Sequence, residues 1–211
     1  MILNMTILRA CPDVRNAAHQ KIGRLPAGLA VWRRSGVGGF MCLCALLLVC
    51  GCLAPLRPEA FANTSPELDP MKFWTGRTAS WGVIENRDGA PTEIVTTTTE
   101  GTAEGPDGLH MIQHVMSGGK DSVREWHMRR LGPHLFEAKA NDMVGTARGS
   151  TSGRTLHWTW ILATEPGNGL KDISMEQWMY LADNGTLLNR TIVTKLGVRL
   201  AEISEQFVRR E

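Results

Sequence analysis

The residues best suited to chemistry lie in residues 174–197, SMEQWMYLADNGTLLNRTIVTKLG. Glu176 and Lys195 carry opposite charges that could orient a polar ligand, and Trp178 and Tyr180 could form the wall of a binding pocket. A simpler interpretation is that the two charges form an exposed ion pair on an outer face. Such pairs contribute little to stability.

An enzymatic interpretation of the same region needs a general base. Asp142 or Glu176 would take that role, with Arg190 or Lys195 holding an anion. A carboxylate is an effective general base near neutral pH when its pKa is raised, and burial raises it. Sequence alone does not assign a reaction to these residues.

A β-hairpin explains why these residues lie close together. Asn184-Gly185 between two apolar runs is a strong hairpin signal, because a type I′ turn needs a positive φ at both central positions. The register that we favour places Trp178 opposite Thr191. A three-residue loop with a bulge is the alternative, and it places Arg190 opposite Trp178.

Directly paired residues share a face of a sheet, so the favoured register divides the hairpin into two faces. One face is amphipathic and carries Glu176, Trp178, Tyr180, Asn189, Thr191 and Lys195. The other is nearly all apolar and includes Met175 and Met179, with Arg190 among them. Methionine fills apolar space adaptably, and a buried Arg190 needs an anionic partner. Either face could line an interior.

The remainder of the body also indicates strands. β-Branched and alternating apolar residues recur between turns rich in Gly, Pro, Asn and Asp. Strands are expected at residues 72–86, 92–102, 109–116, 122–131, 135–140, 146–151, 155–163 and 198–208, besides the hairpin. A helix is the alternative for residues 198–208. This pattern predicts an all-β fold, an antiparallel barrel or sandwich. A barrel of about 8–10 strands either fills with side chains or holds a small ligand.

The histidines give no metal signal within one strand. On a strand His110 and His114 lie about 13 Å apart, at roughly 3.3 Å per residue, which is too far to share one zinc ion. No metal site and no cofactor is therefore expected.

The N-terminal part has a different composition. Six basic residues and one acidic residue precede Leu53, whereas 17 basic and 20 acidic residues follow from there. All five cysteines lie at or before Cys52, so disulfides cannot hold the body together. The body has no basic excess that would indicate nucleic-acid binding.

An export signal accounts for this part. Arg33 and Arg34 precede the apolar run FMCLCALLLVC, residues 40–50. Cys52 follows a lipobox-like sequence and is a candidate for lipidation; cleavage after Ala62 or an uncleaved anchor are alternatives. We expect a signal segment in residues 1–52, a Pro-rich tether in residues 53–70 and a β-barrel domain in residues 71–211.

Several short motifs resemble one bacterial family, domain-of-unknown-function family 3833, over residues 73–210. The motifs are Trp81-Gly82-Val83, Asn86-Arg87-Asp88-Gly89, residues 142–149, Gln177-Trp178-Met179-Tyr180, Leu188-Asn189-Arg190 and Lys195-Leu196-Gly197-Val198. The resemblance implies a lipocalin-like barrel and a lipidated cysteine, in small envelope lipoproteins, and implies no activity. The family usually has Asp where this chain has Gln177.

Together these features predict a lipid-anchored barrel protein on the periplasmic side of the cell envelope. It would bind a small apolar or amphipathic molecule, such as a lipid or fatty acyl chain, and would have no nucleic-acid partner. A structural protein with a filled barrel is the alternative, ahead of the enzymatic interpretation. Soluble periplasmic location would follow from cleavage after Ala62.

Overall fold

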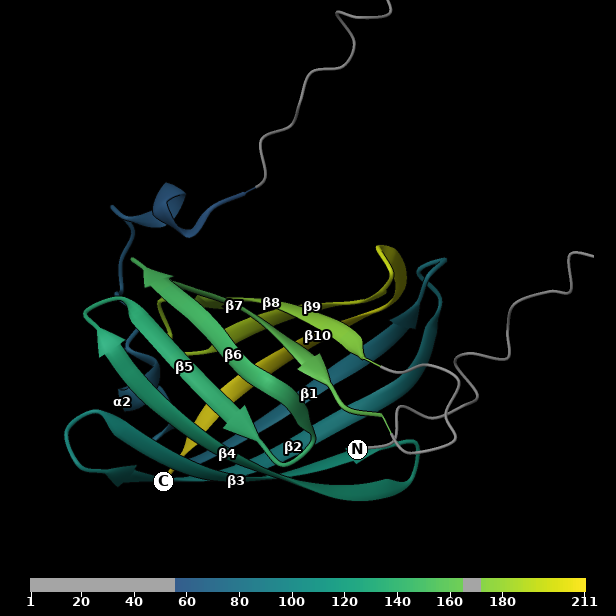
Figure 1. Cartoon of the computed structure of the whole chain (residues 1–211), viewed down its shortest axis with the longest axis horizontal. Coiled ribbons are helices and arrows are strands. Elements are labelled where there is room, and N and C mark those ends of the chain that lie inside the picture. The colour runs from purple at the N-terminus through teal and green to yellow at the C-terminus, as the bar shows by residue number, and fades with distance from the viewer. Residues whose placement is uncertain (1–55, 165–171) are drawn as a thin grey trace, which may run out of the picture. The chain divides into compact units, whose positions relative to one another are not determined.

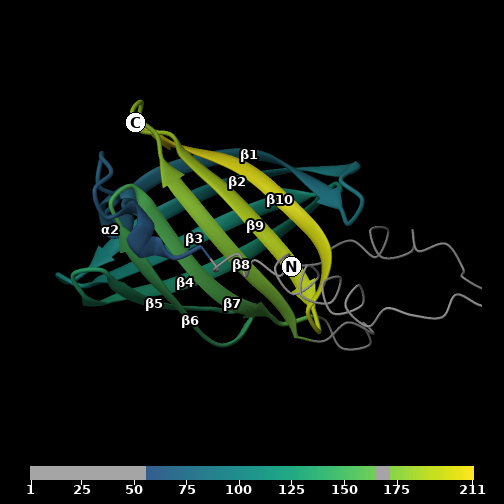
Figure 2. The same cartoon turned by 90° about the horizontal axis from the view of Figure 1, so that it is seen from above.

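The computed structural model describes residues 56–164 and 172–211, and they form a closed barrel (Figures 1 and 2). Its strands are β1 (Gly76–Asn86), β2 (Pro91–Glu104), β3 (Gly108–Ser117), β4 (Lys120–Gly132), β5 (Leu135–Ala140), β6 (Met143–Ser152), β7 (Thr155–Leu162), β8 (Ile173–Leu181), β9 (Leu187–Lys195) and β10 (Val198–Arg210). Each strand pairs antiparallel with its neighbour in sequence, and β1 also pairs with β10. The predicted antiparallel barrel is thereby confirmed.

Alternation of side chains along each strand gives the barrel its interior. In β7, Leu156, Trp158, Trp160 and Leu162 are all 3% exposed or less, because every second residue of a strand points to the same face. The C-terminal segment is the strand β10 and not a helix, and its Ala201, Ile203 and Phe207 are buried on the same alternation.

A short helix, α2 (Pro70–Trp74), packs at the end of the barrel where β1 begins (Figure 1). Asp69 caps it by accepting hydrogen bonds from the backbone N–H groups of Met71 (3.0 Å) and Lys72 (3.4 Å). Trp74 is buried against Phe207, with ring centroids 5.0 Å apart. The expectation that a strand starts at Lys72 is wrong, because Pro70 and the Asp69 cap favour a helical turn.

Part of the segment assigned to a tether contacts the barrel, at strands β6 and β7. It contains the 3₁₀ helix η2 (Pro58–Phe61). The ring of Phe61 lies 5.6 Å from that of Tyr180 and 6.3 Å from that of Trp178. Leu68, further along the segment, is 2% exposed.

The β8–β9 hairpin has the alternative register. Trp178 pairs with Arg190, so the favoured pairing with Thr191 is wrong. The Gly185 N–H donates to the Ala182 carbonyl (2.9 Å) in a three-residue loop. Of the two central residues of the expected I′ turn, only Gly185 (φ +81°) has a positive φ, and that is the pattern of a turn followed by a bulge.

This difference of one residue turns β9 over relative to the prediction, because neighbouring residues of a strand point to opposite faces. Leu187, Asn189, Thr191 and Val193 are buried in the interior, whereas Leu188 and Arg190 lie on the outside. The expectation that Arg190 lies among the apolar residues of β8 is therefore wrong.

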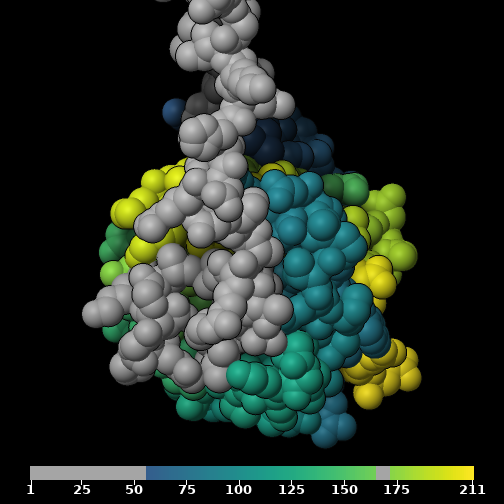
Figure 3. All heavy atoms as spheres, turned by 90° about the vertical axis from the view of Figure 1, so that its right-hand side faces the viewer, coloured from purple at the N-terminus to yellow at the C-terminus, as the bar shows by residue number. Residues whose placement is uncertain are grey.

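Figure 3 views the barrel from the end opposite α2, with the first strands in blue and teal and the last in green and yellow. Within the described part of the chain, no helix combines the length and apolar character needed to cross a membrane. Cys52 and the apolar run before it lie outside the described residues.

Candidate functional site

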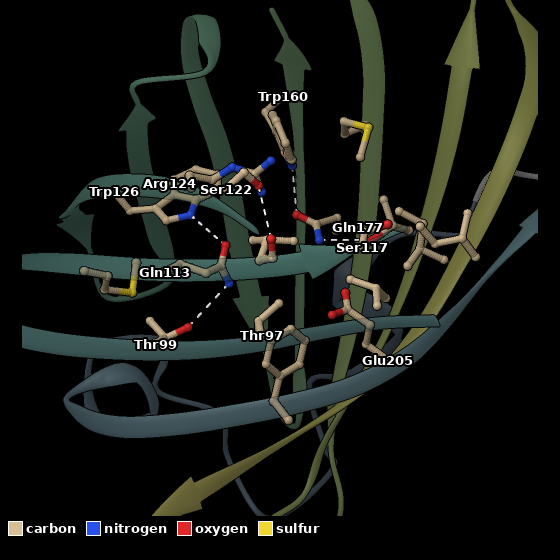
Figure 4. Close-up of a pocket in the computed structure, with 18 of the residues that line it drawn as sticks. Thr97, Thr99, Gln113, Ser117, Ser122, Arg124, Trp126, Trp160, Gln177 and Glu205 are labelled. Atoms are coloured by element: carbon tan, nitrogen blue, oxygen red, sulfur yellow. Dashed lines mark hydrogen bonds between the residues drawn. The ribbon is translucent and has the colours of Figure 1, made fainter. Parts of the chain in front are cut away.

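The barrel interior contains a cavity of about 330 Å³ (Figure 4). Its lining begins at Trp74 and Phe207, beside α2, and reaches Ser117 and Lys120 at the β3–β4 turn, which belongs to the opposite end of the barrel. This volume lies within the range of small-molecule sites. The structural alternative required a completely filled interior, whereas these residues enclose a cavity.

Most of the lining is aromatic, aliphatic or sulfur-containing. These residues are Trp74, Ile84, Val95, Met111, Val115, Trp126, Trp158, Trp160, Met175, Met179, Ile203 and Phe207. Trp126 stacks on Trp158 (5.5 Å, 15°) and meets Trp160 edge-on (5.5 Å, 82°). The three indoles give the cavity a rigid aromatic wall.

Gln177 fixes two of these indoles. Its Oε1 accepts hydrogen bonds from Nε1 of Trp158 (2.7 Å) and of Trp160 (2.8 Å), and its Nε2 donates to Thr191 Oγ1 (3.0 Å). Both indole N–H groups are thus satisfied inside the barrel, as buried polar groups require. Figure 4 shows Trp160 and Gln177 in this arrangement.

Glu205 on β10 places a carboxyl group at the cavity. Ser80 Oγ donates to its Oε1 (3.0 Å) and Asn189 Nδ2 to its Oε2 (3.1 Å). Burial raises the pKa of Glu205 above its usual range, outweighing these hydrogen bonds and the charge of Arg124, which lower it. The group is therefore held toward its neutral form, and it faces the space that a ligand would occupy.

Arg124 and Asp142 form a nearly buried ion pair at the cavity. Arg124 Nε donates to both carboxylate oxygens of Asp142 (2.8 and 2.9 Å), and Arg124 Nη2 lies 2.8 Å from Oδ2. The guanidinium carbon lies 4.8 Å from the ring centroid of Trp160 and 5.5 Å from that of Trp126. The charge of the arginine is thus balanced within the wall.

Three of the predicted ligand-binding residues lie inside the barrel. Met175 and Met179 line the cavity. Asn189 is 4% exposed and donates to Glu205 and to Thr191 Oγ1 (3.2 Å). The apolar residues Met175 and Met179 of β8 therefore face the interior.

The aromatic and charged members of the predicted set lie outside. Glu176 Oε1 accepts from Trp178 Nε1 (3.2 Å) and lies 3.1 Å from His157 Nε2. The Trp178 ring is buried between His157 (4.2 Å between centroids) and Phe61 of η2.

Tyr180 also contacts η2 on the outside, through Phe61. Burial raises the pKa of the Tyr180 hydroxyl, and the charge of Arg190 lowers it by less.

Arg190 forms an ion pair on the outer face with Glu202 of β10. Its Nε lies 2.8 Å from Oε1. This hydrogen bond raises the pKa of Arg190 and lowers that of Glu202. Lys195 lies at the end of β9, paired with Val198 across the β9–β10 turn. Neither Arg190 nor Lys195 lines the cavity.

The residues of the enzymatic interpretation do not converge. Asp142 is engaged by Arg124 at the cavity, whereas Glu176 faces His157 on the outer surface and Arg190 is paired with Glu202. Asp142 is therefore separated from the other members, whereas Glu176 and Arg190 share the outer face, each with a partner of its own.

Glu205, Gln177 and Arg124 are among the polar residues of the cavity that sequence reasoning did not select. Glu205 follows the buried Ile203 by two residues and precedes the buried Phe207 by two. That spacing is a usable signal, because a carboxylate at an inward position of a strand requires an explanation.

The fold and this cavity place the protein in the class of closed antiparallel β-barrels that have an internal cavity. Comparison with family models assigns residues 46–209 to the family described as "Protein of unknown function (DUF3833)". The chain belongs to this family, as the motifs in its sequence indicated. A search of curated proteins gave no match.

Solved structures share the barrel at low sequence identity. An S-type phycobiliprotein lyase, CPES from Guillardia theta, is 10% identical, with a TM-score of 0.50 over 74% of this chain and 99% of the other. Rv2717c from M. tuberculosis is 14% identical, with a TM-score of 0.52 over 71% and 100%. These similarities support the fold.

Proposed function

We propose that this protein binds a small apolar or amphipathic molecule, such as a lipid-like chain, in the barrel cavity. The observation that carries the proposal is the cavity itself, about 330 Å³ in volume and lined by indoles, methionines and aliphatic side chains. Burying apolar ligand surface contributes roughly 25 cal/mol per Å² before the costs of association. The phycobiliprotein lyase has a barrel of similar fold, which is consistent with a ligand-binding role.

The polar groups of the cavity favour one kind of ligand head group. The charge of Arg124 is balanced by Asp142, and Glu205 is held toward its neutral form. An uncharged hydroxyl or ester can hydrogen-bond to such a surface, whereas a ligand carboxylate would find the charge of Arg124 already balanced by Asp142. A neutral amphipath therefore suits the cavity better than a free fatty acid. Arg190, on the outside, does not serve as the head-group partner.

A pair of tryptophan substitutions at neighbouring positions tests the location of binding. Val115 lines the cavity and is 7% exposed, whereas Met116 points outward and is 43% exposed. The probe is the neutral fluorophore Nile red, titrated into each protein. Val115→Trp should weaken binding at least about tenfold, or 1.4 kcal/mol, and Met116→Trp should leave it unchanged. Equal affinities in the two variants would contradict binding in the cavity.

Displacement of Nile red by two compounds of the same chain length tests the head group. Dodecanol should compete more strongly than dodecanoic acid in the wild type, and Glu205→Gln, which keeps this position uncharged, should leave the difference unchanged. Failure of both compounds to displace the probe, together with native mass spectra that show only the free protein, would refute the ligand class.

We further propose that the barrel is exported and attached to the cell envelope through a lipid on Cys52. The charge-flanked apolar run and the confinement of cysteines to the N-terminal segment support this. Attachment at a membrane would place the cavity beside a source of lipid-like molecules. Metabolic labelling with an acyl-chain analogue, compared in the wild type and in Cys52→Ala, tests this anchor, and cleavage after Ala62 is the competing outcome.

A further inference from the structure

Two histidines face each other on the outer surface of the barrel. His110 of β3 and His127 of β4 are direct register partners, and their rings stack with centroids 4.6 Å apart and an interplanar angle of 13°. Glu125 lies two residues before His127 on the same face of β4. The side chains are 28% (His110), 56% (His127) and 47% (Glu125) exposed.

The donor atoms of these three residues converge on one point. His110 Nε2 lies 2.8 Å from Glu125 Oε1, and His127 Nε2 lies 3.7 Å from the same oxygen. One ligand atom from each residue can be chosen so that all three lie within 4.8 Å of one another. In a tetrahedral zinc site with bonds of about 2.0–2.1 Å, ligand atoms are separated by roughly 3.4 Å. Small rotations of exposed side chains bring the three atoms to that spacing.

A second carboxylate lies on the side of the other ring nitrogen of His127. Glu104 Oε2, at the end of β2, lies 3.8 Å from Nδ1 of His127. A carboxylate facing one ring nitrogen favours the proton on that nitrogen and leaves the other as a ligand, as in many metal sites. Nε2 of His127, the nitrogen directed toward Glu125, is then the free donor.

We propose that His110, His127 and Glu125 form a binding site for a divalent transition metal ion such as Zn²⁺. Two imidazoles and one carboxylate match the ligand preference of Zn²⁺ and neighbouring ions, whereas Ca²⁺ and Mg²⁺ prefer oxygen-only sites. Three protein ligands leave one position of a tetrahedral ion open to water or to a donor from another molecule. Because its ligands come from β3 and β4, the ion would tie these two strands together.

This site is separate from the ligand cavity. Trp126, between Glu125 and His127 in sequence, lines the cavity, and the alternation of β4 directs its two neighbours outward. The proposal therefore does not depend on the proposed function. The competing explanation is that the three residues form only surface ion pairs, and this explanation predicts no metal affinity.

Calorimetric titration of the full chain with ZnCl₂ tests the site. The cysteines, all at or before Cys52, are alkylated beforehand, because thiolates also bind zinc. The variants are His110→Gln, His127→Gln and Glu125→Gln. His114→Gln is the matched control, because His114 is an exposed β3 histidine near one carboxylate, Asp121 (3.6 Å).

We expect one zinc ion per chain. The three ligand variants should each weaken binding by roughly 10- to 100-fold or more, Glu104→Gln should weaken it by less, and His114→Gln should not change it. With Co²⁺, the wild type should give the visible absorption of a tetrahedral ion, and His127→Gln should lose it. An unaltered titration in His110→Gln and His127→Gln, or the absence of binding in the alkylated wild type, would overturn the proposal.

Discussion

Replacing Gly101 by Ala should displace α2 from the end of the barrel. Gly101 lies on β2, and a Cβ atom at this position would lie 1.9 Å from the Trp74 carbonyl oxygen and 2.9 Å from its carbonyl carbon. Both are backbone atoms at the end of α2, so no rotation of a side chain relieves the contact. The helix, or the strand beneath it, must move.

The size of the effect follows from what α2 buries. Overfilling a packed site typically costs about 1–3 kcal/mol, and the rigid backbone contact places Gly101→Ala at the upper end. Complete detachment would expose Phe73 and Trp74, both 5% exposed in the fold, at about 1.5–3 kcal/mol each. We therefore expect a loss of about 3 kcal/mol in the free energy of unfolding, with roughly 6 kcal/mol as the upper limit.

Thermal and urea unfolding measure this loss. For a domain of this size each kcal/mol lowers the Tm by about 2–4 °C, so Gly101→Ala should unfold about 6–12 °C below the wild type. Gly132→Ala is the matched control, because a Cβ there meets no atom within 4 Å and the φ angle is not positive; it should stay within about 0.5 kcal/mol. If Gly101→Ala has the same Tm and the same urea midpoint as the wild type and Gly132→Ala, the assigned packing of α2 on β2 is incorrect.

Three further predictions concern other parts of the chain. Because burial raises the pKa of Glu205, the folded state keeps this proton to higher pH than the unfolded state, whose carboxyl titrates near about 4.3, so stability falls as pH rises from there through the folded pKa. Glu205→Gln should remove that fall, and parallel pH profiles of urea unfolding for the two proteins would contradict it. Asp69→Ala should lower stability by about 1–2 kcal/mol through loss of the α2 cap, whereas Asp69→Asn, which can still cap, should lose only the ion pair with Arg130 (2.9 Å), at most about 1 kcal/mol; equal Tm values for these two variants would count against the cap. Cys52→Ala should abolish labelling by an acyl-chain analogue, and persistent labelling would place the lipid elsewhere.

The fold was predictable because its signals are local. Alternation of apolar residues and turns rich in Gly, Asn and Asp mark nearly every strand, and β7 shows both clearly. Closure of the sheet has no such local signal, because the pairing of β1 with β10 joins residues at the two ends of the body. The family resemblance implied that closure, whereas the strand pattern alone allowed a sandwich.

The site was less predictable because it depends on the register of the β8–β9 hairpin. Two different turns fit the loop of this hairpin, and each gives its own register. Asn184-Gly185 fits both a two-residue and a three-residue loop, and the choice decides whether Arg190 or Thr191 points inward. The cavity carboxyl, Glu205, meets Ser80 of β1 and Asn189 of β9 only after the barrel has formed. Likewise, His110 and His127 become neighbours only through the pairing of β3 with β4.

The pairing of β1 with β10 also governs the order in which this barrel can assemble. The nine other pairings join strands that follow each other in the chain, so each can form as soon as its second strand has left the ribosome. β1 is made first, yet one of its edges stays unpaired until β10, which ends at Arg210, has been delivered. A nascent or truncated chain is therefore an open sheet with two exposed edges, which are templates for pairing with other chains. Both exposed edges disappear in a single step, when the thirteen-residue strand β10 pairs with β1.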